Sequence, residues 1–125
     1  MYNKKESIED YLEKIYMLKE KQELVRAIDL ANFMSFSKAS VSIALKKLKS
    51  YGYVLVDENT GNISLTSEGE TIAKSTYERH VIISHFLISI GVSEEAAYHD
   101  ACAIEHILSD ETFEILKERY NNRKK

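Results

Sequence analysis

The sequence predicts a mainly α-helical protein with one small β-hairpin in its first half. Apolar residues recur at helical spacing over most of the chain, and no proline interrupts them. One stretch, YVLVDENTGNISLT at 53–66, instead alternates as strands do. The 125 residues are 44% apolar and 30% charged, which is the composition of a folded globular protein.

Two helices are predicted before the first break. Ser7 is a candidate N-cap for a helix that runs to about Gln22, with an apolar stripe from Ile8 to Leu18. A shorter helix is expected over 25–34. The segment Ser35-Phe36-Ser37 should end it, because serines at such a point favour turns and caps.

The third helix and the hairpin complete a recognisable unit. Ser37 is expected to cap the helix SKASVSIALKKLKSYG, which Gly52 ends, and the hairpin turns over 59–62. Two helices joined by a tight turn and followed by a hairpin are typical of a winged helix-turn-helix, a DNA-binding fold.

Three more helices are predicted in the second half. Ser67 and Glu70 have capping-box spacing at the start of a long helix that Gly91 ends. Ser93 should cap the helix that contains DACAIEHIL, 100–108, and a last helix should run from Ser109 to about Tyr120.

We therefore expect two domains: a winged helix-turn-helix domain over 1–70 and an all-helical domain over 71–125. The second carries more apolar surface than it needs to cover itself, and part of it is assigned to a dimer interface. The apolar surface in question is formed by Ile104, Ile107, Leu108, Phe113 and Leu116.

Charge is distributed unevenly along the chain. The net charge is −3, but no acidic residue occurs from Leu30 to Val56. The same segment contains Lys38, Lys46, Lys47 and Lys49. Such a cluster is either a solvated helix face or a surface for phosphates, and the spacing alone leaves both open.

The segment DACAIEHIL raises the question of a metal site. On a helix, Cys102, Glu105 and His106 share one face at spacings i, i+3 and i+4, and their donor atoms suit a first-row divalent ion. Alternatively, Cys102 packs as a small core residue while the other two face solvent. No HExxH motif and no second cysteine are present, so a zinc peptidase and a zinc knuckle are not supported.

Two other places offer similar donors. The first helix carries Asp10 and Glu13 at i, i+3, and the long helix carries His80. Asp10 could also serve as a capping acid for Ser7, and His80 as a partner of an acid.

The chain resembles the diphtheria-toxin-repressor and manganese-transport-regulator family of bacterial metal-dependent repressors. The resemblance rests on five segments in the same order, which together are far more specific than any one of them. They are EDYLEKIYML, SKASVSIALKKLKSYGYV, LTSEG, ERH and DACAIEHILSD.

This resemblance implies metal ligands at matching positions. One Mn²⁺ or Fe²⁺ site would contain Asp10, Cys102, Glu105 and His106, and a second, adjacent site would contain Glu13 and His80. Other first-row ions such as Co²⁺, Ni²⁺ and Zn²⁺ could substitute. The acids of the first helix resemble the manganese-responsive branch, whereas the thiolate resembles the iron-responsive branch, so the choice of metal stays open.

The resemblance also implies a partner and a mode of action. A homodimer would bind double-stranded DNA at an inverted repeat when metal is present, and would repress metal-uptake genes. The residues expected to face the major groove are Ser37, Lys38, Ala39, Ser40, Ser42 and Ile43. Lys46, Lys47 and Lys49 would bind phosphates.

Two alternatives remain: a winged-helix regulator that does not sense metal, and a small metalloenzyme with an open Cys-Glu-His site. We expect neither enzymatic activity nor a small-molecule substrate. The N-terminus lacks a signal-peptide core and no apolar run reaches membrane length, so a cytoplasmic protein without a membrane partner is expected.

Overall fold

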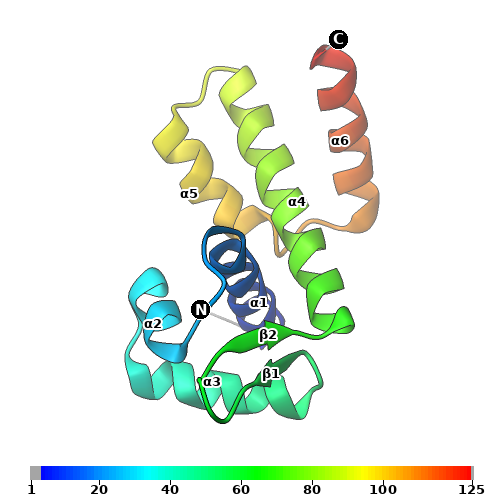
Figure 1. Cartoon of the computed structure of the whole chain (residues 1–125). Coiled ribbons are helices and arrows are strands. Elements are labelled where there is room, and N and C mark those ends of the chain that lie inside the picture. Colours follow the sequence, from blue (N-terminus) through cyan, green and yellow to red (C-terminus); the bar gives the residue numbers. More distant parts are fainter. Residues whose placement is uncertain (1–3, 125) are drawn as a thin grey trace. The chain divides into compact units, whose positions relative to one another are not determined.

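The computed structural model describes residues 4–124, and in this range it forms six helices and one two-stranded hairpin (Figure 1). The mainly α fold class is confirmed. In chain order the elements are α1 (Lys4–Lys21), α2 (Ala27–Met34), α3 (Lys38–Ser50), β1 (Val54–Val56), β2 (Ile63–Leu65), α4 (Ser67–Ser89), α5 (Glu94–Ile104) and α6 (Asp110–Lys124).

The chain divides into two compact units, Met1–Lys74 and Ser75–Lys125. The division falls inside α4, so this helix contributes its first turns to one unit and the rest to the other. None of the helices within residues 4–124 is long and apolar enough to cross a membrane.

One core fills the first unit. Each helix turns its apolar stripe inward and each strand contributes one face, so every element before α4 buries at least one residue. Burying such a side chain stabilises the fold by about 1.5–3 kcal/mol. The fully buried apolar side chains are Leu12, Ile15, Val25, Leu30, Val41, Leu48, Val54 and Ile63.

The turn between α2 and α3 sets the direction of the third helix. Ser35 adopts the left-handed conformation with φ 59° and ψ 39°, which ends α2. Two residues later, the Ser37 hydroxyl oxygen accepts a hydrogen bond from the Ser40 N–H at 3.1 Å. The predicted cap at Ser37 is therefore confirmed.

The hairpin is antiparallel and pairs Val54 with Leu65 and Val56 with Ile63. Its turn end is tied to the segment between α1 and α2. The Asn62 side-chain oxygen accepts from the Val25 N–H at 3.0 Å and from Lys19 Nζ at 2.9 Å. The Ile63 N–H donates to the Val25 carbonyl at 2.7 Å. The hairpin is thereby fixed to the three-helix core.

The start of α4 differs from the prediction. Thr66, not Ser67, is the capping residue: its hydroxyl oxygen accepts from the Gly69 N–H at 3.1 Å and donates to the Gly52 carbonyl at 2.7 Å. Ser67 is already the first helical residue. Thr66 caps the helix because its hydroxyl also donates to the Gly52 carbonyl, which lies in the turn that follows α3.

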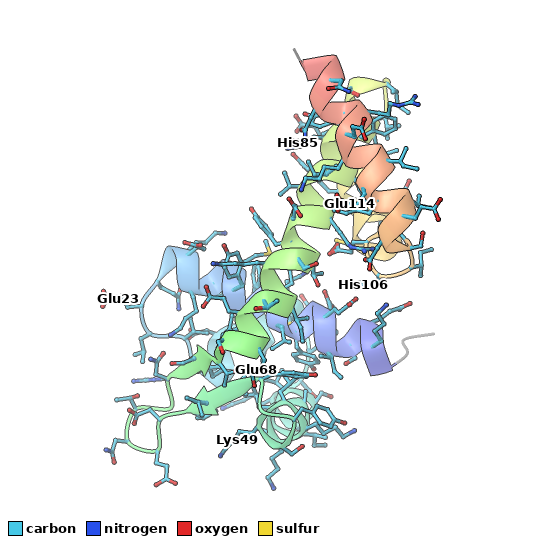
Figure 2. The ribbon with its side chains drawn as sticks, turned by 90° about the vertical axis from the view of Figure 1, so that its right-hand side faces the viewer. Glu23, Lys49, Glu68, His85, His106 and Glu114 are labelled. Atoms are coloured by element: carbon cyan, nitrogen blue, oxygen red, sulfur yellow. The ribbon has the colours of Figure 1, made fainter. Side chains whose placement is uncertain are left out.

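In the second unit, α5 and α6 flank α4 on opposite sides (Figures 1 and 2). Ser93 caps α5 as predicted, by accepting from the Ala96 N–H at 3.3 Å. The helix ends at Ile104, earlier than expected, and α6 runs to Lys124, further than expected. His106 therefore lies in a turn and not on the helical face of Cys102.

The five apolar residues that were expected to contribute to a dimer interface differ in exposure, and three of them are half-buried: Ile104, Leu108 and Leu116. Ile107 is 70% exposed, so it is available for an interface, whereas Phe113 is only 4% exposed and belongs to the interior. Other large apolar side chains exposed in the second unit are Ile90, Tyr98 and Ile115.

Candidate metal centre and DNA-binding surface

Three predicted ligands of the second unit meet around one point. His80 Nδ1 lies 3.1 Å from Glu105 Oε1 and 3.9 Å from Cys102 Sγ. The candidate ligand atoms of the three residues all lie within 4.8 Å of one another. We call these three residues the Cys-His-Glu cluster. It joins His80 to Cys102 and Glu105, whereas the resemblance divides them between two sites.

Local backbone geometry creates this arrangement. Cys102 is on the last turn of α5, and Glu105 is its C-cap residue with helical φ −56° and ψ −26°. Their i, i+3 relation is thus preserved beyond the end of the helix, which keeps both side chains on one face. His80 comes from α4.

The cluster fits a first-row divalent ion. Two ligand atoms on one ion lie about 3 to 3.7 Å apart, because bonds to nitrogen and oxygen are about 2.1 Å and bonds to sulfur about 2.3 Å. The two separations of 3.1 and 3.9 Å are close to this range, and all three candidate ligand atoms lie within 4.8 Å of one another. Imidazole, carboxylate and thiol are also the donors that such ions prefer.

Burial differs among the three residues. The Glu105 side chain is fully buried, His80 is 19% exposed and Cys102 is exposed. The Tyr98 ring stacks on His80 with 6.2 Å between centroids and 21° between planes. The cluster is consequently closed on the carboxylate side and accessible from the thiol side.

Arg79, which sequence reasoning did not single out, holds the segment that carries Glu105. Its Nη1 donates to the Leu108 carbonyl at 2.6 Å and to the Glu105 carbonyl at 3.4 Å. Its Nη2 pairs with Asp110 at 2.6 Å, and the guanidinium lies 5.0 Å from the Phe113 ring centroid. The feature of the sequence that could have pointed to Arg79 was its position next to the candidate ligand His80 in the ERH segment.

Other imidazoles and Ser84 lie outside the cluster. His106 is buried and lies at the turn between α5 and α6 (Figure 2). His85 is exposed on α4, and His99 is exposed with Nδ1 3.3 Å from Asp100. Ser84 is buried, and its hydroxyl donates to the His80 carbonyl of its own helix at 2.8 Å.

The acids of α1 form a second group of candidate ligands, in the first unit. Lys14 Nζ lies 3.0 Å from Asp10 Oδ1 and 3.0 Å from Glu13 Oε1. Glu13 is only 1% exposed, and among residues 4–124 its second oxygen, Oε2, is buried with no hydrogen-bond partner. Burial tends to lower the pKa of Lys14, but Glu13 and Asp10 outweigh it and raise that pKa.

Lys14 was also missed by sequence reasoning. The available signal was its position four residues after Asp10, where a helix brings a lysine next to an acid, whereas its contact with the adjacent Glu13 does not follow from helical spacing.

The residues predicted to contact DNA share the exposed surface of α3. The helix buries Val41, Leu45 and Leu48 on its other side. Figure 2 shows Lys49 on this helix. The exposed set comprises Ser37, Lys38, Ala39, Ser40, Ser42, Ile43, Lys46, Lys47 and Lys49. An exposed, lysine-bearing helix followed by a hairpin is the arrangement that winged helix-turn-helix proteins insert into the major groove.

A winged helix-turn-helix unit followed by a helical unit with a donor set for divalent metal defines a metal-responsive transcriptional regulator. Comparison with known families agrees with this class. Residues 5–61 match the family described as iron dependent repressor, N-terminal DNA binding domain. Residues 66–125 match its metal binding and dimerisation domain. The chain belongs to the iron-dependent repressor family.

Individual proteins that are similar to this chain are also named as transcriptional regulators. An HTH-type transcriptional regulator of Methanocaldococcus jannaschii is 40% identical over 90% of this chain and 90% of its own length. The HTH-type transcriptional regulator MntR of Bacillus subtilis is 40% identical over 82% of this chain and 72% of its own. This is a family of transcriptional regulators, not enzymes, so the metalloenzyme alternative is set aside.

Solved structures show the same fold. The manganese regulator SloR matches 91% of this chain with a TM-score of 0.81 and 35% identity. The chain spans about half of that structure, 53% of its length.

Proposed function

We propose that this protein is a transcriptional repressor that binds operator DNA as a homodimer when Mn²⁺ or Fe²⁺ is bound. The Cys-His-Glu cluster is the observation that carries the proposal. It combines three metal-binding side chains within 4.8 Å in a domain of a metal-dependent regulator family.

The ligands we propose are Cys102, His80 and Glu105, with His106, Asp10 and Glu13 as further ligands. A bound divalent ion would supply the positive charge that these carboxylates and the thiolate need in a partly buried site. Glu105 and His80 orient each other through their 3.1 Å contact, and Arg79 fixes the backbone that carries Glu105. Co²⁺, Ni²⁺ and Zn²⁺ would also suit these donors.

The DNA target we propose is an inverted repeat, because a two-fold dimer presents two copies of α3. Ser37, Lys38, Ala39, Ser40, Ser42 and Ile43 would face the groove, and Lys46, Lys47 and Lys49 would bind phosphates. Exposed apolar residues of the second unit, such as Ile107 and Ile115, support self-association. The regulated genes would encode metal uptake, and the protein would act in the cytoplasm.

The test is DNA binding by the purified protein under anaerobic conditions. Labelled promoter fragments from the genome are titrated with chelator, Mn²⁺ or Fe²⁺, and Cys102→Ser is compared with the native chain. We expect binding that requires metal and that Cys102→Ser weakens at least about tenfold, as ligand loss usually does. The ion that gives the larger gain identifies the preferred metal.

Equal affinity with chelator and with either ion would overturn the corepressor role. In that case the regulator would bind DNA without sensing metal, and the C-terminal helices would serve for dimerisation alone.

A further inference from the structure

The contact that Lys14 makes with two acids of α1 points to a role beyond helix stability. Its ammonium lies 3.0 Å from Asp10 and 3.0 Å from Glu13, on a helix in which both acids are proposed ligands. A single ammonium group therefore contacts one oxygen of each of the two carboxylates.

Burial makes this contact more important than an ordinary surface pair. Glu13 is 1% exposed, and a buried carboxylate without a compensating cation is strongly destabilising. Lys14 Nζ reaches only Oε1, while Oε2 has no hydrogen-bond partner within residues 4–124. The lysine thus neutralises the carboxylate and leaves one of its oxygens available to a second ligand.

We propose that Lys14 is a built-in competitor of the metal, which holds Asp10 and Glu13 in the metal-free protein and sets the metal concentration at which the regulator responds. The proposal rests on the proposed function, because it requires these acids to be metal ligands.

The physical reason is charge balance. If the ammonium stayed in place, a divalent ion would put three positive charges beside two carboxylates, so binding favours its departure. Lys14 has a route out of the site, because its side chain is 20% exposed and its flexible stem can carry the charge into water. The free energy of breaking the two ion pairs is subtracted from that of metal binding, which weakens the apparent affinity.

An ordinary i, i+4 ion pair provides the contrast. Such a pair contributes little to stability, because water screens it, and one without a candidate metal ligand should not change metal affinity. The pair between Lys74 and Glu70, at 2.8 Å and with both side chains exposed, is of this kind. Lys74→Gln is therefore the matched control for Lys14→Gln.

The experiment measures Mn²⁺ affinity directly, without DNA, by the spin-resonance signal of free Mn²⁺ in a titration of the native chain and the variants. We expect Lys14→Gln to bind Mn²⁺ about tenfold more tightly, while Lys74→Gln stays at the native value. Lys14→Arg, which restores the positive charge, should return the affinity to within a few-fold of native. Unchanged or weaker Mn²⁺ binding by Lys14→Gln would overturn the proposal.

Two further variants separate this inference from the proposed function. If Asp10→Asn and Glu13→Gln both leave Mn²⁺ affinity unchanged, the ligand assignment itself fails. If Asp10→Asn and Glu13→Gln weaken Mn²⁺ binding while Lys14→Gln has no effect on it, the ligand assignment stands and only the proposed competition by Lys14 fails. Should Lys14→Gln unfold without metal, recovery of the native circular dichroism with Mn²⁺ supports the proposal, and failure to recover contradicts it.

Discussion

At the scale of single residues, one side chain holds the backbone that carries a proposed metal ligand. Arg79 is the clearest positioning residue. Its fork of donors spans two backbone carbonyls of the segment 105–108, and its charge lies over the Phe113 ring. The pair with Asp110 adds little, because that carboxylate is 98% exposed to solvent.

Arg79→Lys should weaken Mn²⁺ binding about tenfold, since residues that orient metal ligands typically contribute about 10- to 100-fold. Lysine keeps the charge but cannot donate to two carbonyls and one carboxylate at once. Amide hydrogen exchange of residues 105–108 should accelerate in the same variant. Lys117→Gln, which removes the 2.7 Å pair with Glu78, is the control. Unaltered exchange together with native affinity would refute the positioning role.

At the scale of elements, the first turn of α4 shows why the LTSEG segment contains a glycine. A Cβ at Gly69 would lie far inside contact distance of the Tyr53 carbonyl oxygen. The same carbonyl accepts from the Thr66 N–H at 3.0 Å, so it cannot move away without breaking that hydrogen bond. The hairpin and α4 can approach each other this closely only with glycine at 69.

Gly69→Ala should therefore lower the free energy of unfolding by about 1–3 kcal/mol, the usual cost of overpacking. Denaturant unfolding followed by circular dichroism measures it. Ser67→Ala, on the same turn but exposed, should leave stability within about 0.5 kcal/mol of native. A Gly69→Ala protein as stable as the native one would show that hairpin and helix can separate without cost.

At the scale of the whole molecule, the charge of α3 is opposite in sign to the net charge of the chain. The net charge is −3, yet α3 contains four lysines and no acid. The tip of the hairpin carries the exposed acids Asp57 and Glu58. This division concentrates positive charge on α3, the helix whose lysines we propose to bind phosphates.

Replacing Lys46, Lys47 and Lys49 together with glutamine should weaken binding to all DNA sequences alike. The slope of log affinity against log salt should fall by about 0.9 for each phosphate that is no longer neutralised. Fluorescence anisotropy at several salt concentrations, with an operator and a scrambled duplex, measures both effects. Lys74→Gln should not change the slope. Weakening confined to the operator would instead mean that these lysines read bases.

Much of the fold was predictable because it depends on local signals. The break at Ser35–Ser37, the cap at Ser37 and the alternating hairpin each follow from residues adjacent in sequence. The cap of α4 was not predictable in this way, because the choice of Thr66 over Ser67 depends on the Gly52 carbonyl, 14 residues earlier.

The sequence by itself determined the mainly α winged helix-turn-helix fold, the lysines of α3 and the candidate metal-donor residues of the second half. Periodicity, caps and residue type suffice for these. Only the tertiary structure decided that His80 joins Cys102 and Glu105, that Arg79 holds the segment carrying Glu105, and that Lys14 occupies the acids of α1. The first two depend on residues brought together from different helices. The contact of Lys14 with both acids depends on the rotamer of each side chain and on which Glu13 oxygen Lys14 can reach once Glu13 is buried. Sequence spacing specifies neither of these.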